Sequence, residues 1–463
     1  MSLPEYIFRK YDIRGIYPDD LNEESSYCIG LGIGDVFTEM GYSNCAVGWD
    51  NRSSSKALRD SVTQGLVEKG INVKYLGVVP TPVVYFMTCE EDFDCGIQIT
   101  ASHNPEEYNG IKFVKNDAYK FSPEEMQEVF GYASAVVLRE KVPSDGNRPI
   151  ESEDALGKYM SYFINNFSFS TPFKVVLGCG NGACSTIAPL IFESLGCEVF
   201  SEDCFLNSDF PEGVANPEDS SFMKKLSSRV VKYGADLGIG FDSDGDRVGF
   251  VDRRGITVPI AEILALFSKE VLAKYPGGDV IYDVKFSSDI EPVIRGFGGN
   301  PIQVATGHPN IDPRIKEGAV LGVEYSQHIY FGRDYKGFDD GIYAAIRLLE
   351  TLDRLNRPLD ELVGFLPKRY STSEIKIPCP EKDKQGIMKS IASYVAANYK
   401  DVLALDGVKV RLSDNGWFLI RVSNTSPYLS VRMEGKTPED LEMIRSNVLS
   451  ILEQHSVLDL SVV

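Results

Sequence analysis

Positive charge is scarce in this sequence, which has 47 Lys and Arg residues against 67 Asp and Glu residues and a net charge of −20. Nucleic-acid backbones are held mainly by Lys and Arg, so this balance argues against a non-specific nucleic-acid-binding protein. It does not exclude a phosphorylated small molecule as the ligand, because such a molecule requires only a local cluster of positive groups.

Long apolar runs and paired cysteine motifs are also missing. No stretch of 18 apolar residues occurs and residues 1–15 contain no apolar signal segment, so we expect a soluble cytoplasmic protein with no membrane partner. The nine cysteines include no C-x-x-C pair, which argues against a zinc ribbon or a disulfide framework. Free thiols, buried in a reducing compartment, are the simpler expectation.

A weak threefold repeat is visible in the 463-residue chain, whose composition (43% hydrophobic, 25% charged) is that of a globular protein. Each repeat unit has three short apolar runs, separated by segments long enough for a helix. The runs cover residues 45–50, 73–77, 95–100, 174–178, 197–200, 236–241, 279–284, 301–305 and 319–323. Such alternation predicts α/β units with buried strands.

The fold class that follows is α/β, with three similar mixed α/β domains and a smaller C-terminal α+β domain around a central cleft. The predicted domains span residues 1–148, 149–252, 253–366 and 367–463. Each has a polar loop, at residues 101–105, 242–247, 324–328 and 421–426. The first three loops follow the third apolar run of their unit, and ligands in open α/β sheets bind beyond the carboxyl ends of strands. We therefore expect the four loops to meet in the cleft.

Three aspartates at alternate positions, Asp242, Asp244 and Asp246, follow a buried apolar run. Carboxylates spaced in this way can converge on one hard cation, and a set of oxygen ligands favours Mg2+ over Zn2+. An EF-hand loop would need Gly at the sixth position and Glu at the twelfth, where this chain has Arg247 and Arg253. An exposed acidic turn is the alternative, and the preceding buried run argues against it.

Ser102 stands beside His103, and Pro105 ends the apolar run. A serine next to a histidine suits acyl transfer or phosphoryl transfer. The first chemistry needs an oxyanion hole and an orienting acid, and the chain has no G-x-S-x-G turn. The second needs a metal and cationic groups, which the aspartate loop and the Arg-containing loops supply, so we favour phosphoryl transfer through Ser102.

The two remaining loops suit the two ends of a sugar phosphate. Glu324 and Ser326 occupy alternate positions and could accept from and donate to neighbouring sugar hydroxyls. Arg421 begins a loop rich in hydroxyl and amide groups that could surround a phosphate. A surface turn and a polar strand connection are the alternative interpretations of these two segments.

At these loops the chain resembles the α-D-phosphohexomutase family, and most closely its bacterial phosphomannomutase/phosphoglucomutase branch. The resemblance covers nearly the whole chain, in order. The matching motifs are residues 8–15, 100–105, 108–113, 242–247, 283–285, 306–308, 324–328 and 421–425.

The resemblance implies a mutase that moves a phosphoryl group between the 1- and 6-positions of a hexose. Ser102 would carry the phosphate, hexose 1,6-bisphosphate would be intermediate and activator, and Mg2+ would be held by the three aspartates and phosphorylated Ser102. Arg247 would add a cation. His103 and His328 are the candidate bases, Arg14 and Lys285 could assist, and the sequence does not rank them. The implied substrate-binding residues are Tyr11, Arg14, Lys112, Lys285, His308, Glu324, Ser326, His328, Arg421, Ser423, Asn424 and Thr425.

The chain departs from the family pattern at three places, of which the last two bear on the choice of sugar. Trp49 stands where the family usually has arginine, and Gln327 where this branch usually has glycine, which predicts a differently shaped backbone in the sugar loop. Pro309 and Pro313 replace a lysine-rich helix start and predict an altered loop. We expect mannose or glucose phosphates as substrates and a monomer or weak dimer.

Three alternatives stay open. A phosphoglucosamine mutase typically has glutamine where this chain has Tyr325, so the mannose/glucose branch is favoured. A sugar-phosphate-binding protein without catalysis would not need the intact serine and aspartates. A serine phosphatase would release free phosphate with each turnover.

Overall fold

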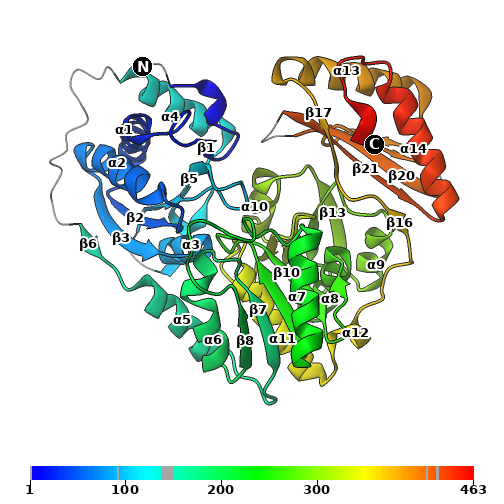
Figure 1. Ribbon diagram of the computed structural model, residues 1–463, viewed down its shortest axis with the longest axis horizontal. Coiled ribbons are helices and arrows are strands. Elements are labelled where there is room, and N and C mark those ends of the chain that lie inside the picture. Colours follow the sequence, from blue (N-terminus) through cyan, green and yellow to red (C-terminus); the bar gives the residue numbers. More distant parts are fainter. Residues whose placement is uncertain (1–2, 91–92, 137–149, 413–414, 424–426, 463) are drawn as a thin grey trace.

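The computed structural model describes residues 3–90, 93–136, 150–412, 415–423 and 427–462. Four sheets follow one another along the chain, each covered by helices (Figure 1). The last domain, orange to red in Figure 1, stands above the third and is joined to it by the segment that leads to its first strand. Within the described residues, no helix is long and apolar enough to cross a bilayer.

The first sheet has six strands in the order β1-β5-β4-β2-β3-β6. Their bounds are β1 Ile13–Ile16, β2 Asn44–Trp49, β3 Asn72–Val78, β4 Cys95–Ile99, β5 Tyr108–Lys115 and β6 Glu151–Ser152. The helices of this domain are α1 Glu23–Glu39, α2 Ser55–Glu68, α3 Thr81–Glu90 and α4 Pro123–Ala135. Helices α1 and α2 approach closely because glycine occupies the crossing: a Cβ on Gly30 would lie 2.3 Å from the carbonyl oxygen of Val62.

The second sheet has the order β11-β10-β9-β7-β8 and the third the order β13-β12-β14-β15. The second consists of β7 Lys174–Gly178, β8 Glu198–Glu202, β9 Leu237–Phe241, β10 Val248–Asp252 and β11 Thr257–Val258, with α5 Ala155–Asn166, α6 Ala188–Ser194 and α7 Ser220–Tyr233. The third consists of β12 Asp279–Asp283, β13 Asn300–Val304, β14 Leu321–Val323 and β15 Ile329–Phe331, with α8 Ile260–Lys274, α9 Ile290–Gly296, α10 His308–Lys316, α11 Gly341–Leu355 and α12 Leu359–Leu362.

The predicted threefold repeat is present. In each of the first three sheets the first strand of the unit (β2, β7 or β12) lies between the other two and runs parallel to both. The third strand of the unit then pairs antiparallel with the strand that follows it, as in β4–β5, β9–β10 and β14–β15. The three polar loops predicted to carry the chemistry are the connections between these antiparallel strands, so equivalent positions of the repeat hold different side chains.

The fourth sheet is antiparallel, as expected of a separate α+β domain. It contains β16 Tyr370–Ser371, β17 Ile375–Pro378, β18 Val402–Leu403, β19 Val408–Arg411, β20 Gly416–Val422 and β21 Tyr428–Gly435, covered by α13 Glu381–Asn398 and α14 Pro438–Leu452. Short 3-10 turns lie at Glu5–Ile7, Asn116–Ala118, Ala183–Thr186 and Leu460–Val462.

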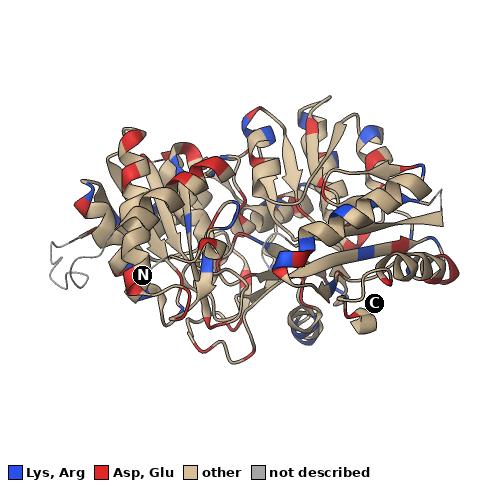
Figure 2. Ribbon diagram, turned by 90° about the horizontal axis from the view of Figure 1, so that it is seen from above, with Lys and Arg blue, Asp and Glu red and all other residues tan. Residues whose placement is uncertain are grey.

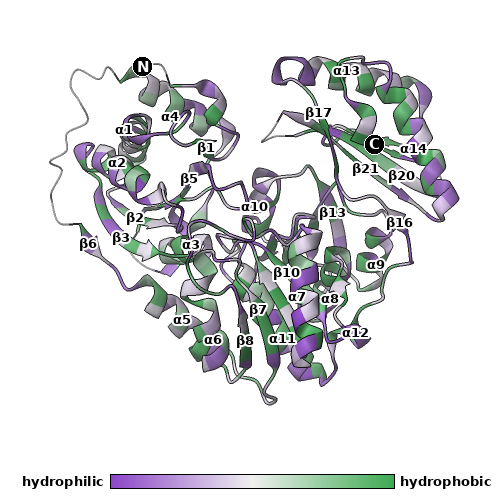
Figure 3. Ribbon diagram, in the orientation of Figure 1, coloured by the Kyte–Doolittle hydropathy of each residue, from purple (hydrophilic) through white to green (hydrophobic). Residues whose placement is uncertain are grey.

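One cluster of buried side chains, from Ala46 to Leu362, joins the second and third domains and includes one side of the first. The rest of the first domain has a separate core between its sheet and helices α1, α2 and α4. The C-terminal domain has a core of its own. A small cluster of Val284, Trp417 and Leu419 is buried where the third and fourth domains meet. The buried strands β7 and β10 are largely green in Figure 3, and charges of both signs are mixed along the helices in Figure 2.

Two expectations about local structure need correction or qualification. The segment with Pro309 and Pro313 is not an irregular loop but the helix α10, which begins at His308. Proline is compatible with a first helical turn, since its missing N–H would be unpaired there, and this accounts for Pro309.

Strands β6 and β11 lie beyond the predicted boundaries at residues 148 and 252, yet they pair within the first and second sheets. All nine cysteines are free thiols, as expected.

Candidate functional site

A polar cavity of about 370 Å³ lies where the four domains meet. All four domains contribute to its lining, which comprises Tyr11, Arg14, His103, Asn104, Pro105, Asn216, Glu218, Arg247, Lys285, Thr306, Gly307, His308, Glu324, Ser326, His328, Glu374, Lys376, Arg421, Ser423 and Tyr428. The predicted convergence of the polar loops is therefore confirmed for their described residues. Asn424 and Thr425 lie outside the described residues.

Ser102 is buried at the edge of this cavity, in a backbone conformation that few non-glycine residues adopt (φ 51°). Its Oγ donates a hydrogen bond to Asp242 Oδ2 (2.8 Å) and lies 3.2 Å from His103 Nδ1. The loop after β4 thus brings the serine to the first residue of the aspartate loop after β9. Strained positions of this kind are frequent at functional sites.

Arg52 holds the Ser102 loop in place, a role that the sequence did not reveal. Its guanidinium donates to the carbonyl oxygens of Ser102 (2.7 Å) and Asn104 (2.7 Å). It also donates to those of Pro105 (2.6 Å) and Tyr108 (3.0 Å), and its Nε is paired with Asp50. The buried arginine therefore satisfies four backbone acceptors of an irregular segment, which fixes where Ser102 lies.

Replacing Arg52 with methionine should lower the free energy of unfolding by about 3–5 kcal/mol, because it leaves Asp50 as an unpaired buried charge. The measurement is the free energy of unfolding of the first domain, obtained from its transition in denaturant. As a control, Arg357→Met removes a surface pair with Glu361 and should cost less than about 1 kcal/mol. Equal small effects for both variants would contradict the role assigned to Arg52.

The three aspartates lie together as predicted, with oxygen atoms within 4.8 Å of one another. All three are buried. Oδ1 of Asp244 and Oδ1 of Asp246 are buried without a hydrogen-bond partner among the described residues. A buried acidic cluster with unsatisfied carboxylate oxygens fits a hard divalent cation.

The protonation of the cluster is uneven. Burial and the charges of Asp246 and Asp244 raise the pKa of Asp242 well above its usual range. Burial alone would raise the pKa of Asp244 too, but the charge of Lys112 and hydrogen bonds from Lys112 and Thr81 outweigh it and lower that pKa.

Lys112 lies with the aspartates rather than along the cavity wall. Its Nζ is 2.7 Å from Asp244 Oδ2 and 2.7 Å from Asp246 Oδ2. It is not one of the described residues that line the cavity. The structure therefore places Lys112 as the counter-charge of the acidic cluster, whereas the sequence indicated a ligand of the substrate.

His103 and His328 have different surroundings. Burial and the charges of Arg247 and Arg14 lower the pKa of His103 well below its usual value, so its ring is neutral near pH 7. His328 Nε2 accepts a hydrogen bond from Arg247 Nε (2.9 Å), and its Nδ1 lies 2.7 Å from Asp339 Oδ2. His328 is therefore held between Arg247 and Asp339, whereas His103 Nδ1 lies beside Ser102 Oγ, which makes His103 the better placed of the two candidate bases.

A second group of metal-ligand type surrounds His328, formed with His308, Asp246 and Asp339. Three cations already face it: Lys112 on Asp246 (2.7 Å), Lys120 near Asp339 (3.5 Å) and Arg247 on His328. His308 Nδ1 is also hydrogen-bonded to the hydroxyl of Tyr330. This group therefore places two histidines among cations that already contact its carboxylates.

The sugar loop connects β14 and β15, and both Glu324 and Ser326 line the cavity as predicted. Glu324 Oε1 accepts a hydrogen bond from the backbone N–H of Gly307 (2.8 Å). Gln327 has a φ of 76°, a conformation that glycine adopts without strain, and its side chain donates to the carbonyl oxygen of Pro217 (3.0 Å). The glutamine thus keeps a glycine-like turn, contrary to the expectation of a differently shaped backbone.

Positive groups gather along the cavity: Arg14, Arg247, Lys285, Lys376 and Arg421. Arg14 is paired with Asp12 and Arg421 with Asp406, each at 2.7 Å, so their guanidinium planes are fixed. Such a set can receive two phosphate groups.

Some cavity residues escaped the sequence analysis, namely Asn216, Glu218, Glu374, Lys376 and Tyr428. Glu374 and Lys376 are two positions apart at the start of β17, and this strand alternation was the available signal. Trp49, one of the three departures, packs against Tyr75 and the guanidinium of Arg59 and is not among the described residues of the cavity.

Comparison with known proteins finds one and the same family along nearly the whole chain. Four family models match in order, described as phosphoglucomutase/phosphomannomutase α/β/α domains I, II and III and C-terminal domain, at residues 5–136, 157–255, 261–370 and 374–451. The chain is 38% identical over 450 residues to a phosphomannomutase/phosphoglucomutase of Pseudomonas aeruginosa, covering 96% of this chain and 95% of that one. It is 33% identical over 458 residues to a phosphoglucomutase of Neisseria gonorrhoeae, covering 98% of each. A crystal structure of a phosphoglucomutase/phosphomannomutase family protein from Burkholderia thailandensis superimposes with a TM-score of 0.87 at 29% identity, covering 98% of each chain.

Proposed function

This chain belongs to the phosphoglucomutase/phosphomannomutase family, and we propose that it interconverts the 1- and 6-phosphates of mannose and glucose through a phosphorylated Ser102. The observation that carries the proposal is the cavity that His103, Arg247, Glu324 and Arg421 line from four domains. Ser102 lies directly beside His103, and the acidic cluster lies beside Ser102 and Arg247. Its volume of about 370 Å³ suits a hexose phosphate.

The transferring phosphate and the idle phosphate would occupy opposite ends of this cavity. The idle phosphate would be held by Arg421 and Ser423, together with Asn424 and Thr425. Glu324 and Ser326 would bind sugar hydroxyls between the two ends, and Tyr11, Lys285 and His308 would contact the substrate from the walls. Since the bisphosphate must be accepted in both orientations, recognition of paired hydroxyls by Glu324 and Ser326 suits the reaction better than recognition of one unique sugar edge.

In the proposed first step, the free hydroxyl of the sugar phosphate attacks the phosphorus on Ser102. A new P–O bond to the sugar forms as the P–Oγ bond breaks, and the sugar hydroxyl gives up its proton to neutral His103. His103 then returns that proton to the departing Ser102 Oγ, which lies 3.2 Å from its Nδ1. Arg14 and Arg247 would balance the charge of the transferring group. The 1,6-bisphosphate then reorients in the cavity and transfers its other phosphate to Ser102, which restores the phosphoenzyme.

Asp242, Asp244 and Asp246, with a phosphate oxygen on Ser102, would hold Mg2+ in this proposal. When bound, the ion would neutralise charge on the transferring phosphoryl group. Lys112 would keep Asp244 ionised for this purpose, and its Nζ also contacts the carboxylate of Asp246.

The test is isomerisation of mannose 1-phosphate and glucose 1-phosphate in the presence of Mg2+ and a trace of glucose 1,6-bisphosphate. We expect turnover of both sugars with almost no release of free phosphate. Stoichiometric phosphate release would indicate a phosphatase instead. Absence of turnover, with phosphate shown to be on Ser102, would refute the assigned substrates.

Gln327 is the residue to vary if only one sugar is turned over. Gln327→Gly retains the turn and removes the hydrogen bond to Pro217. We expect the ratio of kcat/KM for the two sugars to change by less than about tenfold, because the backbone conformation is preserved. A much larger change would show that the side chain itself selects the sugar.

A further inference from the structure

We propose that Lys409 and Arg432 of the C-terminal domain are positioning residues that orient Lys285 and Tyr325 of the third domain when the two domains dock. The inference rests on the proposed function, in which Lys285 contacts the substrate. Its basis is a set of contacts that fixes the segment after β12, where Lys285 lies.

The first contacts are made to three consecutive carbonyl groups. Lys409 Nζ, from β19, donates to the carbonyl oxygens of Val284 (3.0 Å) and Phe286 (2.6 Å). Arg432, from β21, donates to the carbonyl oxygen of Lys285, which lies between them. The segment has left the sheet at this point, so these carbonyl groups have no strand partner. The C-terminal domain therefore supplies the donors that hold the backbone of Lys285.

Arg432 also contacts the sugar loop. Its guanidinium lies 3.8 Å from the ring centroid of Tyr325, a residue between Glu324 and Ser326. The backbone N–H of Tyr325 in turn donates to Asp283 Oδ2 (3.0 Å), at the end of β12. One arginine of the C-terminal domain thus bridges the Lys285 segment and the sugar loop.

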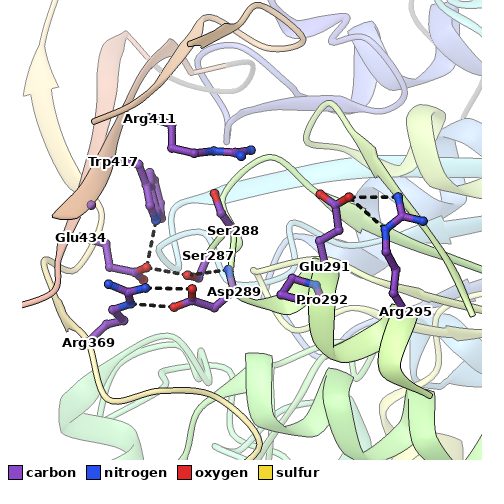
Figure 4. Close-up of a pocket in the computed structure, with 11 residues that line it drawn as sticks. Ser287, Ser288, Asp289, Glu291, Pro292, Arg295, Arg369, Arg411, Trp417 and Glu434 are labelled. Atoms are coloured by element: carbon purple, nitrogen blue, oxygen red, sulfur yellow. Dashed lines mark hydrogen bonds and ion pairs between the residues drawn. The ribbon is translucent and has the colours of Figure 1, made fainter. Parts of the chain in front are cut away.

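Further contacts cross the interface around these two cations, and Figure 4 shows the outer ones, made by Trp417, Glu434 and Arg369. Trp417 packs with Val284 and lies 4.2 Å (ring centroid) from Lys409 Nζ. Glu434 accepts hydrogen bonds from the Trp417 indole (2.9 Å) and from Ser287 Oγ (2.5 Å). Beside them Arg369 is paired with Asp289 (2.6 Å). The contacts cross the domain boundary, so separation of the domains would break them together.

Docking should also depend on pH through Lys409. The lysine is buried and faces Arg432, Glu434, Asp283 and Arg411, and burial followed by the charge of Arg432 lowers its pKa to about 7. An undocked, exposed lysine would have a pKa of about 10.4. Between these values the undocked state binds more protons, so docking becomes more favourable as the pH rises above 7.

The experiment is a double-mutant cycle of Lys409→Met and Lys285→Ala, measured as kcat and KM for the sugar phosphate. Lys409→Met retains the stem beside Trp417 and should lower kcat/KM by about tenfold. Because Lys409 acts through Lys285, the double variant should lose little more than Lys285→Ala alone. Lys389→Met, the same change at an exposed site of the same domain, should leave kcat/KM unchanged. Fully additive losses would overturn the proposal.

Two readouts separate positioning from general stability. In Lys409→Met, amide hydrogen exchange of residues 284–287 and 325 should speed up, while exchange in the core of β20 should not. Between pH 6 and 8, kcat/KM should rise less in the variant than in the wild type. Ionisation of the substrate phosphate affects both proteins equally, so it cancels when the two are compared. Unchanged exchange at residues 284–287 would refute the role of Lys409. The exchange measurement needs no turnover, so it stands even if the proposed reaction fails.

Discussion

Ser102→Ala is expected to lower turnover of hexose 1-phosphates by roughly a thousandfold or more, the scale of losing a covalent nucleophile. Ser102 Oγ is the hydroxyl held between Asp242 and His103, and alanine offers no atom to carry the phosphate. The other members of the site keep their own contacts, so sugar phosphate should still bind. The loss should therefore fall on kcat rather than on the dissociation constant.

Three measurements check this result. Incubation with labelled hexose 1,6-bisphosphate should phosphorylate the wild type and not the variant. Titration calorimetry should give similar affinities for both. Ser53→Ala, at an exposed serine of the same domain, serves as control and should retain full activity. Turnover in Ser102→Ala within about tenfold of the wild type would rule out the phosphoserine mechanism.

Removal of divalent metal is expected to have the next largest effect, lowering kcat by about a hundredfold or more. The acidic cluster has two buried, unsatisfied carboxylate oxygens, and without a divalent cation these carboxylates would repel a phosphoryl group on the neighbouring Ser102. Exhaustive chelation should abolish turnover, and Mg2+ should restore it. Activity that survives chelation, with metal shown to be absent, would contradict the assignment.

Asp242→Asn tests the same site without chelator. The side chain keeps its volume, but a neutral amide is a weaker ligand for Mg2+ than a carboxylate, so we expect a fall in kcat of about a hundredfold and a higher Mg2+ requirement. Asp209→Asn, at an exposed position of the same domain, should change neither. A variant that lost activity but bound Mg2+ as tightly as the wild type would assign Asp242 to proton transfer and not to the metal.

Much of the architecture could be read from local pattern. The nine apolar runs correspond to β2, β3, β4, β7, β8, β9, β12, β13 and β14 to within about two residues, because buried parallel strands require continuous apolar sequence. The loops after β4, β9 and β14 were identifiable because equivalent connections in a repeat lie at equivalent ends of their sheets. Pro309 misled because proline is compatible with a helix start as well as with a loop, whereas Pro313 lies inside the helix, a position that proline rarely takes.

The sequence could not reveal partners that lie far apart in the chain. Lys112 is separated by 132 residues from Asp244, and Arg52 by 50 from the carbonyl group of Ser102. Asp339 contacts His328, and Lys409 contacts the backbone next to Lys285, but neither residue belongs to a recognisable motif. Each of these contacts depends on the relative placement of elements, which no local pattern encodes.

The sequence by itself determined the fold class, the threefold repeat, the loops and the residue types that those loops present, because strand burial and loop polarity act over a few neighbouring residues. Only the tertiary structure decided what each charged group does. It assigned Lys112 to the acidic cluster, placed His328 between Arg247 and Asp339 and left His103 beside Ser102. The physical reason is that Coulomb interactions and hydrogen bonds in a buried site depend on distances of a few ångström between elements that folding brings together.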